Sequence, residues 1–305
     1  MKKLPLTHLV DIGGLTPPFR RLMLREYAVN GAEHIVFSHN HCNALVAAEN
    51  PSELLAEYKK ETADAGLSFV DAHSVFGADK DLNCPKEELR PAMLEMHKKC
   101  LAWAAECGVK TITIHTGNPS YPDVDIETFH QYAIRSLEEL LPVAESCGVT
   151  ICIENIWFPT NTPGRLLDML KHFNSNNLGF CFDAGHANIM AHPTDNPDSR
   201  AVIGWGNMGI PVQWSFDELE KMLPHVVNCH LHDNYGITDH HQTPGHGDIN
   251  WNKLLETLAK APRLQCLQSE VVYPLYEKNS SIREICEKFN ELYQIFNGFY
   301  AQKNA

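Results

Sequence analysis

The sequence predicts a single (β/α)₈ barrel of parallel strands over residues 1–305, and three observations lead to this prediction. The length suits one such barrel, because these domains typically take about 250 residues or more. Glycines recur roughly every forty residues, each after a helical pattern and before an apolar strand. Metal-capable side chains recur where those strands are expected to end.

The glycine repeat defines serial strand–helix units. Gly31, Gly66, Gly108 and Gly148 begin the segments GAEHIVF, GLSFVDAH, GVKTITIH and GVTICIEN. A glycine just past a helix end adopts the left-handed conformation that other residues avoid. The helix–glycine–strand period therefore predicts βα units in series.

Eight strands follow from this period and from the β-branched runs. We expect them at residues 4–11, 32–38, 67–74, 110–116, 149–156, 178–184, 226–232 and 264–272. An open doubly wound sheet would need a GxGxxG turn and a helix start after the first strand. The segment Asp11-Ile12-Gly13-Gly14 is too short for that turn, which leaves the closed barrel.

The segments between the strands carry one apolar stripe each, as helices packed on a barrel do. One stripe comprises Leu89, Met93, Met96, Cys100, Trp103 and Cys107, and the next comprises Ile126, Phe129, Ala133, Leu140, Val143 and Cys147. Residues 187–215 break the period, so we expect a long irregular insertion after the sixth strand. Its Trp205 and Trp214 are expected to wall a pocket or a subunit contact, and the alternative is a solvated surface loop.

Composition bounds the classes of function. The net charge of −13 argues against a large nucleic-acid footprint, which usually appears as a basic patch. The N-terminus lacks the apolar core of a signal peptide, and no segment is long and apolar enough for a membrane span. The ten cysteines lack CxxC spacing, so we expect free thiols and a cytoplasmic protein.

Six strand ends carry imidazoles or carboxylates. The residues are His73, His115, Glu154, Asp183 with His186, His230 with His232 and Asp233, and Glu270. Side chains at the carboxyl ends of barrel strands converge on one mouth. Imidazoles and carboxylates that converge on one point form a divalent-metal site, so we expect a metalloenzyme.

The segment TDHHQTPGHGDINW adds further polar residues before a helix expected to start at residues 248–251. Asp239 and His241 have the D-x-H spacing of another metal site, and His246 is a further candidate. The alternative is a polar loop that shapes the pocket without touching metal. His232 shares a strand face with His230 and either ligates metal or orients a ligand. His39 and His41 are expected at the rim of the mouth.

These motifs together resemble the xylose-isomerase-like barrel superfamily, from the third strand to the C-terminus. The resemblance implies Glu154, Asp183, His230 and Glu270 as ligands of one metal and His186 as a substrate contact. The segment PGHGDINW is similar to the superfamily motif P-G-x-G-x-[IV]-x-[WY]. Members include sugar isomerases and epimerases as well as the family 2 apurinic-site endonucleases.

The endonuclease branch binds three metals, and this chain matches its additional ligands too. Those matches are His73, His115, Asp239 and His241. Three features favour the isomerase branch. His240 stands where the endonuclease loop usually has a basic residue, the loops SHNHCNALVAAEN and GNPSYPDVDIETFH contain no Lys or Arg, and the insertion tryptophans suit a small closed pocket.

The expected function is therefore a divalent-metal-dependent isomerase or epimerase that acts on a small sugar, ketose or hydroxy-carbonyl compound through an enediolate. The metal is Mn²⁺, Zn²⁺, Mg²⁺ or Co²⁺, one ion by preference and up to three. Glu154 and Glu270 would exchange the carbon-bound proton, and His186 would hydrogen-bond the substrate oxygen. Asn155 and Trp157 are expected to line the substrate pocket.

Three alternatives stay open. One is an endonuclease-like phosphodiester hydrolase, the second is a lyase or dehydratase of the same superfamily, and the third is a non-catalytic metal-binding protein. The expected partner is a small carbohydrate rather than nucleic acid or membrane. Because barrels of this type often pair, a homo-oligomer is also expected.

Overall fold

Eight parallel strands close into one barrel in the order β1 to β8, as the sequence predicts. The computed structural model describes residues 3–271 and 280–303. Every strand lies within its predicted range. The strands are β1 (Leu6–His8), β2 (His34–Phe37), β3 (Ser68–His73), β4 (Thr111–Ile114), β5 (Thr150–Glu154), β6 (Leu178–Asp183), β7 (Val226–Leu231) and β8 (Leu267–Ser269).

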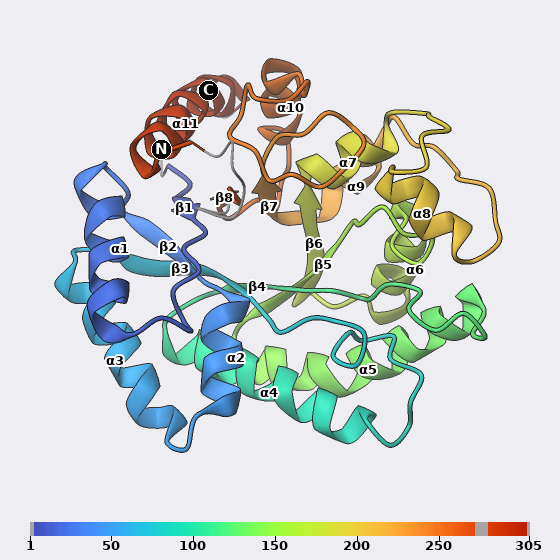
Figure 1. The fold of residues 1–305 in the computed structure, drawn as a ribbon, viewed down its shortest axis with the longest axis horizontal. Coiled ribbons are helices and arrows are strands. Elements are labelled where there is room, and N and C mark those ends of the chain that lie inside the picture. The colour runs from blue at the N-terminus through green and yellow to red at the C-terminus, as the bar shows by residue number, and fades with distance from the viewer. Residues whose placement is uncertain (1–2, 272–279, 304–305) are drawn as a thin grey trace.

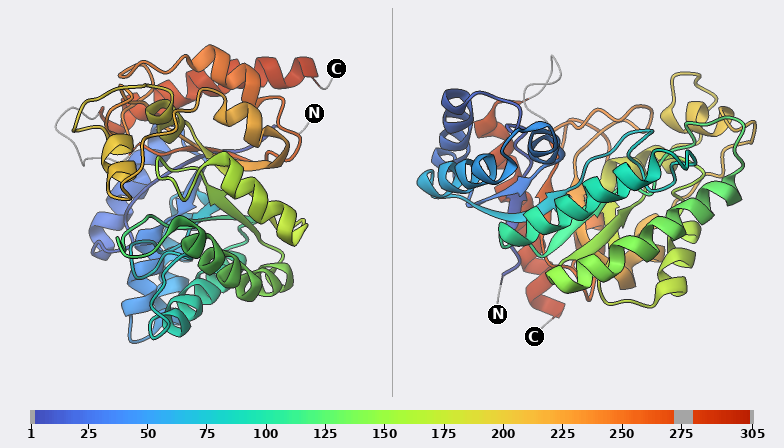
Figure 2. Two further views of the ribbon diagram at one scale, coloured as in Figure 1. Left: turned by 90° about the vertical axis from the view of Figure 1, so that its right-hand side faces the viewer. Right: turned by 90° about the horizontal axis from the view of Figure 1, so that it is seen from below.

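Helices surround the barrel (Figure 1). They are α1 (Pro17–Val29), α2 (His39–Ala47), α3 (Pro51–Asp64), α4 (Arg90–Glu106), α5 (Ile126–Cys147), α6 (Pro163–Phe173), α7 (Ala184–Met190), α8 (Arg200–Gly206), α9 (Glu218–Met222), α10 (Trp251–Leu258) and α11 (Ile282–Lys303). Both termini lie close together at the end of the barrel away from α8 (Figure 2). No helix among the described residues is long and apolar enough to cross a membrane.

Helix α5 shows how the sequence sets the boundaries of a unit. Its N-cap is Asp125, whose carboxylate accepts a hydrogen bond from the Thr128 amide at 2.8 Å. Its C-cap is Gly148, where φ is +65°, and β5 starts two residues later. Such left-handed C-caps favour glycine because a side chain there is strained. The repeating glycines therefore mark unit boundaries, as predicted.

The predicted irregular insertion at residues 187–215 is partly wrong. It contains the end of α7 and all of α8, which pack into a small separate core. Ile189, Met190, Ala201 and Trp205 are buried there, and Trp214 packs against them. Apolar residues at helical spacing on these short segments explain why the insertion folds rather than forming a solvated loop.

Two other predictions about the chain are confirmed. Helix α10 begins at Trp251 after Asn250, whose side chain accepts from the Lys253 amide at 3.1 Å. All ten cysteines are free thiols, and most are buried.

Candidate metal centre

Four strand-borne side chains meet at the carboxyl-terminal mouth of the barrel. Glu154 and Asp183 end β5 and β6, His230 is the penultimate residue of β7, and Glu270 follows β8. All four are buried, and their ligand atoms lie within 4.8 Å of one another. The parallel register brings together residues that are up to 116 positions apart, because each strand ends at the same mouth.

His230 lies at the middle of this set. Its Nδ1 atom is 3.2 Å from Glu154 Oε1, 3.2 Å from Glu270 Oε1 and 3.8 Å from Asp183 Oδ2. Its Nε2 atom is 3.3 Å from the hydroxyl of Thr113 inside the barrel. One imidazole nitrogen therefore faces three carboxylates, which is a donor set suited to a divalent cation.

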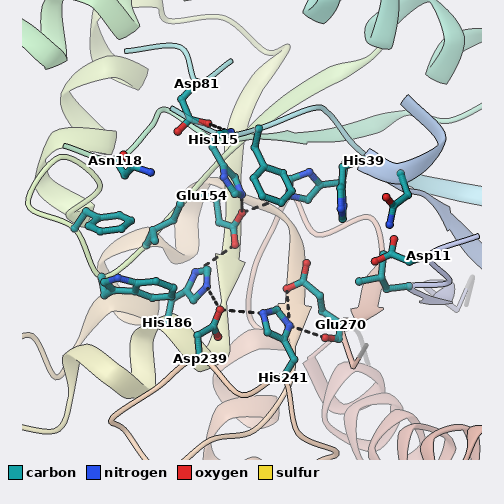
Figure 3. Close-up of a pocket in the computed structure, with 18 residues that line it drawn as sticks. Asp11, His39, Asp81, His115, Asn118, Glu154, His186, Asp239, His241 and Glu270 are labelled. Carbon is teal, nitrogen blue, oxygen red and sulfur yellow. Dashed lines mark hydrogen bonds and ion pairs between the residues drawn. The ribbon is translucent and has the colours of Figure 1, made fainter. Parts of the chain in front are cut away.

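Further donors surround these four residues (Figure 3). His115 Nε2 lies 3.1 Å and His73 Nε2 lies 3.8 Å from Glu154 Oε2. On the opposite side, His241 Nε2 lies 2.9 Å from Asp239 Oδ2. His232 Nε2 lies 3.1 Å from Asp183 Oδ2, and its ring stacks on that of His241 at 4.0 Å.

Three of these histidines share one hydrogen-bonding pattern. The Nδ1 atoms of His73, His186 and His241 each lie 2.8 Å from a main-chain carbonyl oxygen, to which they donate. When such a ring is neutral, donation from Nδ1 leaves the lone pair of Nε2 free to ligate a cation. Histidines that bind metals usually donate their other nitrogen in this way.

The electrostatics of the cluster also fit a cation. Burial raises the pKa of Glu154, but the imidazoles of His230 and His115 outweigh it and hold that pKa well below the usual value. Burial lowers the pKa of His186, but Asp183 and Asp239 outweigh it and raise the pKa to about 10. Asp239 Oδ1 is buried without a hydrogen-bond partner among the described residues. Carboxylates packed this densely require positive charge between them.

A cavity of about 490 Å³ opens directly on the cluster. Apolar side chains form part of its wall, namely Leu9, Phe76, Ile156, Trp157 and Phe158. Asp11, His39, Asp81 and Asn118 also line it and belong to none of the candidate ligand groups (Figure 3). Among the described residues that line the cavity there is no Lys or Arg. The cavity can enclose a small, uncharged, hydroxylated molecule.

The structure brings most of the predicted site residues into this centre. Those that lie in the cluster are His73, His115, Glu154, Asp183, His186, His230, His232, Asp239, His241 and Glu270. Trp157 lines the cavity as predicted, and so does His39. The D-x-H pair therefore lies at the mouth.

Expectations for three residues need correction. Asn155 does not line the cavity, because the strand alternates and its side chain instead bridges Asp183 and Glu218 behind the site. His246 is exposed and faces Glu284 of α11 at 3.5 Å. His41 is not a rim residue, since it is fully buried between Phe37 and Tyr58.

The two tryptophans of the insertion lie outside the cavity wall. Trp205 is buried behind Trp157, and its indole nitrogen donates to the Trp157 carbonyl at 3.0 Å. Trp214 packs on the same small core. These residues support the wall, and Trp157 forms its surface.

Sequence reasoning missed several residues of the site. Asp11 follows the apolar run of the first strand, so the rule of strand-end residues would have found it. Cys181 of β6 lies within ligand distance of Glu154 and His230, but a cysteine inside a strand resembles any buried thiol. Asp81 and Asn118 come from loops, where no periodic pattern indicates direction.

A closed parallel barrel with histidines and carboxylates at its carboxyl-terminal mouth is a TIM barrel with a candidate metal-binding site. The chain matches the xylose isomerase-like TIM barrel family over residues 24–290 and belongs to that family. This superfamily contains metal-dependent sugar epimerases and isomerases together with endonuclease 4.

Relatives of known sequence are distant. The protein MJ1311 of Methanocaldococcus jannaschii is 28% identical over 211 residues, which cover 66% of this chain and 64% of that protein. A probable endonuclease 4 of a Thermotoga species is 26% identical over 166 residues, which cover 53% of this chain and 56% of that protein. The chain thus spans less than two thirds of the length of these relatives.

Several solved structures superpose on nearly the whole chain. A D-tagatose 3-epimerase-like protein superposes with a TM-score of 0.73 at 20% identity, over 99% of this chain and 100% of that protein. At this level of identity the similarity establishes the barrel fold.

Proposed function

We propose that the protein is a divalent-metal-dependent isomerase or epimerase of a small, unphosphorylated sugar or ketose. The observation that carries the proposal is the pair Glu154 and Glu270. Both line the small cavity, and both lie 3.2 Å from the same imidazole nitrogen of His230. Two carboxylates beside one cation site serve proton transfer at neighbouring positions of a bound substrate.

A bound divalent cation supplies Lewis-acid polarisation of a substrate carbonyl, and Glu154, Asp183, His230 and Glu270 would hold it. Burial raises the pKa of Glu270, but His230 and His241 outweigh it and hold that pKa below its usual value, so both glutamates are ionised at neutral pH. One oxygen of Glu154 then accepts the carbon-bound proton. Glu270, after taking a proton from solvent, returns it to the neighbouring carbon or the opposite face, and Glu154 releases its proton to solvent. Against the effect of burial, Asp183 and Asp239 raise the pKa of His186 to about 10, so its ring is protonated, and its Nε2 can donate to the substrate oxygen that gains charge in the enediolate.

The lining of the cavity supports an uncharged substrate. The side chains that most often bind a phosphate group are Arg and Lys. The described lining residues include neither and offer imidazoles, carboxylates and the amides of Asn40 and Asn118 instead, which suit hydroxyl groups. The aromatic wall of Phe76, Trp157 and Phe158 suits the apolar face of a sugar ring or chain. The epimerase-like structural neighbour supports the same class of substrate.

The second candidate is metal-assisted phosphodiester hydrolysis. Its supporting observation is that donors beyond the first four gather in further groups, such as His73 with His115 and Glu154, and His232 with His241 and Glu270. Several metals could therefore bind, as the probable endonuclease 4 among the relatives suggests. A lyase or dehydratase would use the same proton transfer as the isomerase.

The test uses protein stripped of metal and reloaded singly with Mn²⁺, Mg²⁺, Zn²⁺ or Co²⁺. Each form is incubated in heavy water with a panel of ketoses and aldoses. We expect interconversion of at least one pair, with deuterium at the carbon that changes. Conversion without any deuterium over many turnovers would contradict the enediolate route. Cleavage of an abasic-site oligonucleotide without turnover of any sugar would establish the second candidate instead.

A further inference from the structure

We propose that Asp233 is a positioning residue that holds the loop at residues 234–250 so that Asp239 and His241 reach the metal centre. The inference rests on the proposed metal-dependent function. The sequence places Asp233 among the metal-capable residues of CHLHD. In the structure its carboxylate is fully buried and belongs to none of the candidate ligand groups. Its oxygens instead accept hydrogen bonds from the loop that connects β7 to α10 and from the first residue of α10.

The main chain of Asp233 pairs with that of Gln242 across this loop. Its amide donates to the Gln242 carbonyl at 2.7 Å, and the Gln242 amide donates to the Asp233 carbonyl at 2.9 Å. The neighbouring His241 has a φ of +47°, a left-handed conformation that is unfavourable for a residue with a side chain. The paired hydrogen bonds therefore hold a backbone that would otherwise relax.

The carboxylate of Asp233 accepts hydrogen bonds from the second half of the loop. Oδ2 accepts from the Gly245 amide at 2.8 Å and from the Trp251 indole at 2.9 Å. Oδ1 accepts from the Asn234 amide at 3.0 Å and from the Ile249 amide at 3.3 Å. Four donors on one buried carboxylate is a fully satisfied arrangement that few other side chains can reproduce.

This arrangement gives a physical reason for the residues of PGHGDINW. Gly245 and Ile249 supply amides to Asp233, and Trp251 supplies its indole. Gly247 passes so close that an added Cβ would collide with Asp233 Oδ1 and with the main chain of Asn234. The motif is thus a set of partners for one carboxylate, and none of its residues needs to touch a metal.

The candidate metal ligands therefore fall into two kinds, those held by strands and those held by the loop. Glu154, Asp183 and His230 are held by strands and do not depend on the loop. Asp239 and His241 depend on it, and they contact each other at 2.9 Å. Loss of the Asp233 carboxylate should therefore act on metal binding only through Asp239 and His241.

The test is a double-mutant cycle on metal affinity, which does not require turnover. Metal-free protein is titrated with Co²⁺ and followed by visible absorption, for wild type, Asp233→Asn, Asp239→Ala/His241→Ala and the triple variant. We expect Asp233→Asn to weaken Co²⁺ binding about ten- to a hundred-fold, the usual effect of losing a group that orients a ligand. In the Asp239→Ala/His241→Ala background, the same change should weaken it less than about two-fold, because the coupled sites are already lost.

Two outcomes would overturn the proposal. One is Co²⁺ binding by Asp233→Asn that matches wild type. The other is an equal loss in both backgrounds, which a general structural role of Asp233 would produce. Amide hydrogen exchange should rise at residues 239–247 and stay unchanged in β5 and β6.

Trp251→Phe provides a milder variant if Asp233→Asn does not fold, since it removes one donor and keeps the carboxylate. It should give a smaller effect with the same dependence on background, and an equal effect in both backgrounds would contradict the proposal. Because sugar turnover is not a readout, failure of the proposed isomerase function leaves this test intact.

Discussion

At the residue scale, Glu154 is the side chain on which the centre converges. Its two oxygens lie 3.1 Å from His115, 3.2 Å from His230, 3.3 Å from His186 and 3.8 Å from His73. A single carboxylate that faces four imidazoles can bridge two cation positions or serve as a ligand and a base. Its loss should therefore affect binding and chemistry together.

Glu154→Gln should abolish turnover and weaken divalent-metal binding by about ten-fold or more. The amide keeps the shape of the side chain but carries no charge and cannot accept the substrate proton. Calorimetric titration with Mn²⁺ and the sugar assay measure the two effects. Glu139→Gln on the exposed face of α5 is the matched control and should change neither. Full activity with metal retained would remove Glu154 from the centre.

Gly185 shows how closely the second residue of α7 packs on the centre. A Cβ at this position would collide with the imidazole of the buried His232. Gly185→Ala should therefore displace His232, lower the free energy of unfolding by about 1–3 kcal/mol and weaken metal binding. Gly164→Ala in α6 is the control, because its Cβ would meet nothing within 4 Å. Chemical denaturation measures the free energy of unfolding of both variants. Equal stability of Gly185→Ala and Gly164→Ala would contradict the packing argument.

At the scale of elements, α7 and α8 form a module that supports the cavity wall. Trp205 of α8 donates to the Trp157 carbonyl, and the Trp157 ring meets His186 edge-on at 4.7 Å. The buried core of this module comprises Ile189, Met190, Ala201 and Trp205, none of which is a candidate ligand, whereas His186 at the start of α7 is one. Changes in this core should therefore influence the shape of the substrate pocket without removing a metal donor.

Trp205→Ala should raise KM for the substrate identified in the sugar panel and leave metal affinity within about two-fold of wild type. The reason is that removing the buried indole leaves a cavity behind Trp157, and large-to-small changes of this kind cost about 3–5 kcal/mol. Trp205→Phe retains most of the packing, so its KM should lie between those of wild type and Trp205→Ala. A large loss of metal binding with KM unchanged would show that the module acts on the donors instead.

At the scale of the whole molecule, several buried histidines are held in the neutral state. Burial, together with the nearby His39 and Arg20, lowers the pKa of His41 to about 3. Burial likewise lowers the pKa of His8 and of His97 to about 4. At these three positions the unfolded chain binds more protons than the folded protein once the pH falls below about 6.5, so their contribution to stability falls as the pH decreases from there.

His41→Gln tests this at one position without loss of the helix cap. His41 is the third residue of α2, and its Nδ1 atom accepts from the Ser38 amide at 3.2 Å. Glutamine at this position can make the same capping-box contact but does not titrate. Between pH 6.5 and about 4, the stability of the metal-free variant should fall less steeply, by up to about 1.4 kcal/mol per pH unit. Parallel curves for variant and wild type, measured by urea unfolding, would contradict the neutral buried state.

Local sequence patterns determined the barrel and the inner donors. Strand order in a closed parallel barrel equals chain order, so a strand-end residue such as Glu154 or Asp183 has only one mouth to face. Period-two alternation also placed His230 and His232 on one face. The same alternation excludes Asn155 from the cavity. Asn155 directly follows Glu154, whose side chain points inward, so the side chain of Asn155 points to the opposite face.

Only the tertiary structure decided the residues on loops and the roles of the buried polar groups. Asp239 and His246 occur in one loop, yet one enters the centre and the other faces α11, because the contacts of Asp233 fix the path between them. No local period encodes such a path. The sequence by itself therefore determined the fold and the strand-borne donors, whereas long-range hydrogen bonds and packing decided which loop residues complete the site and which tryptophan walls it.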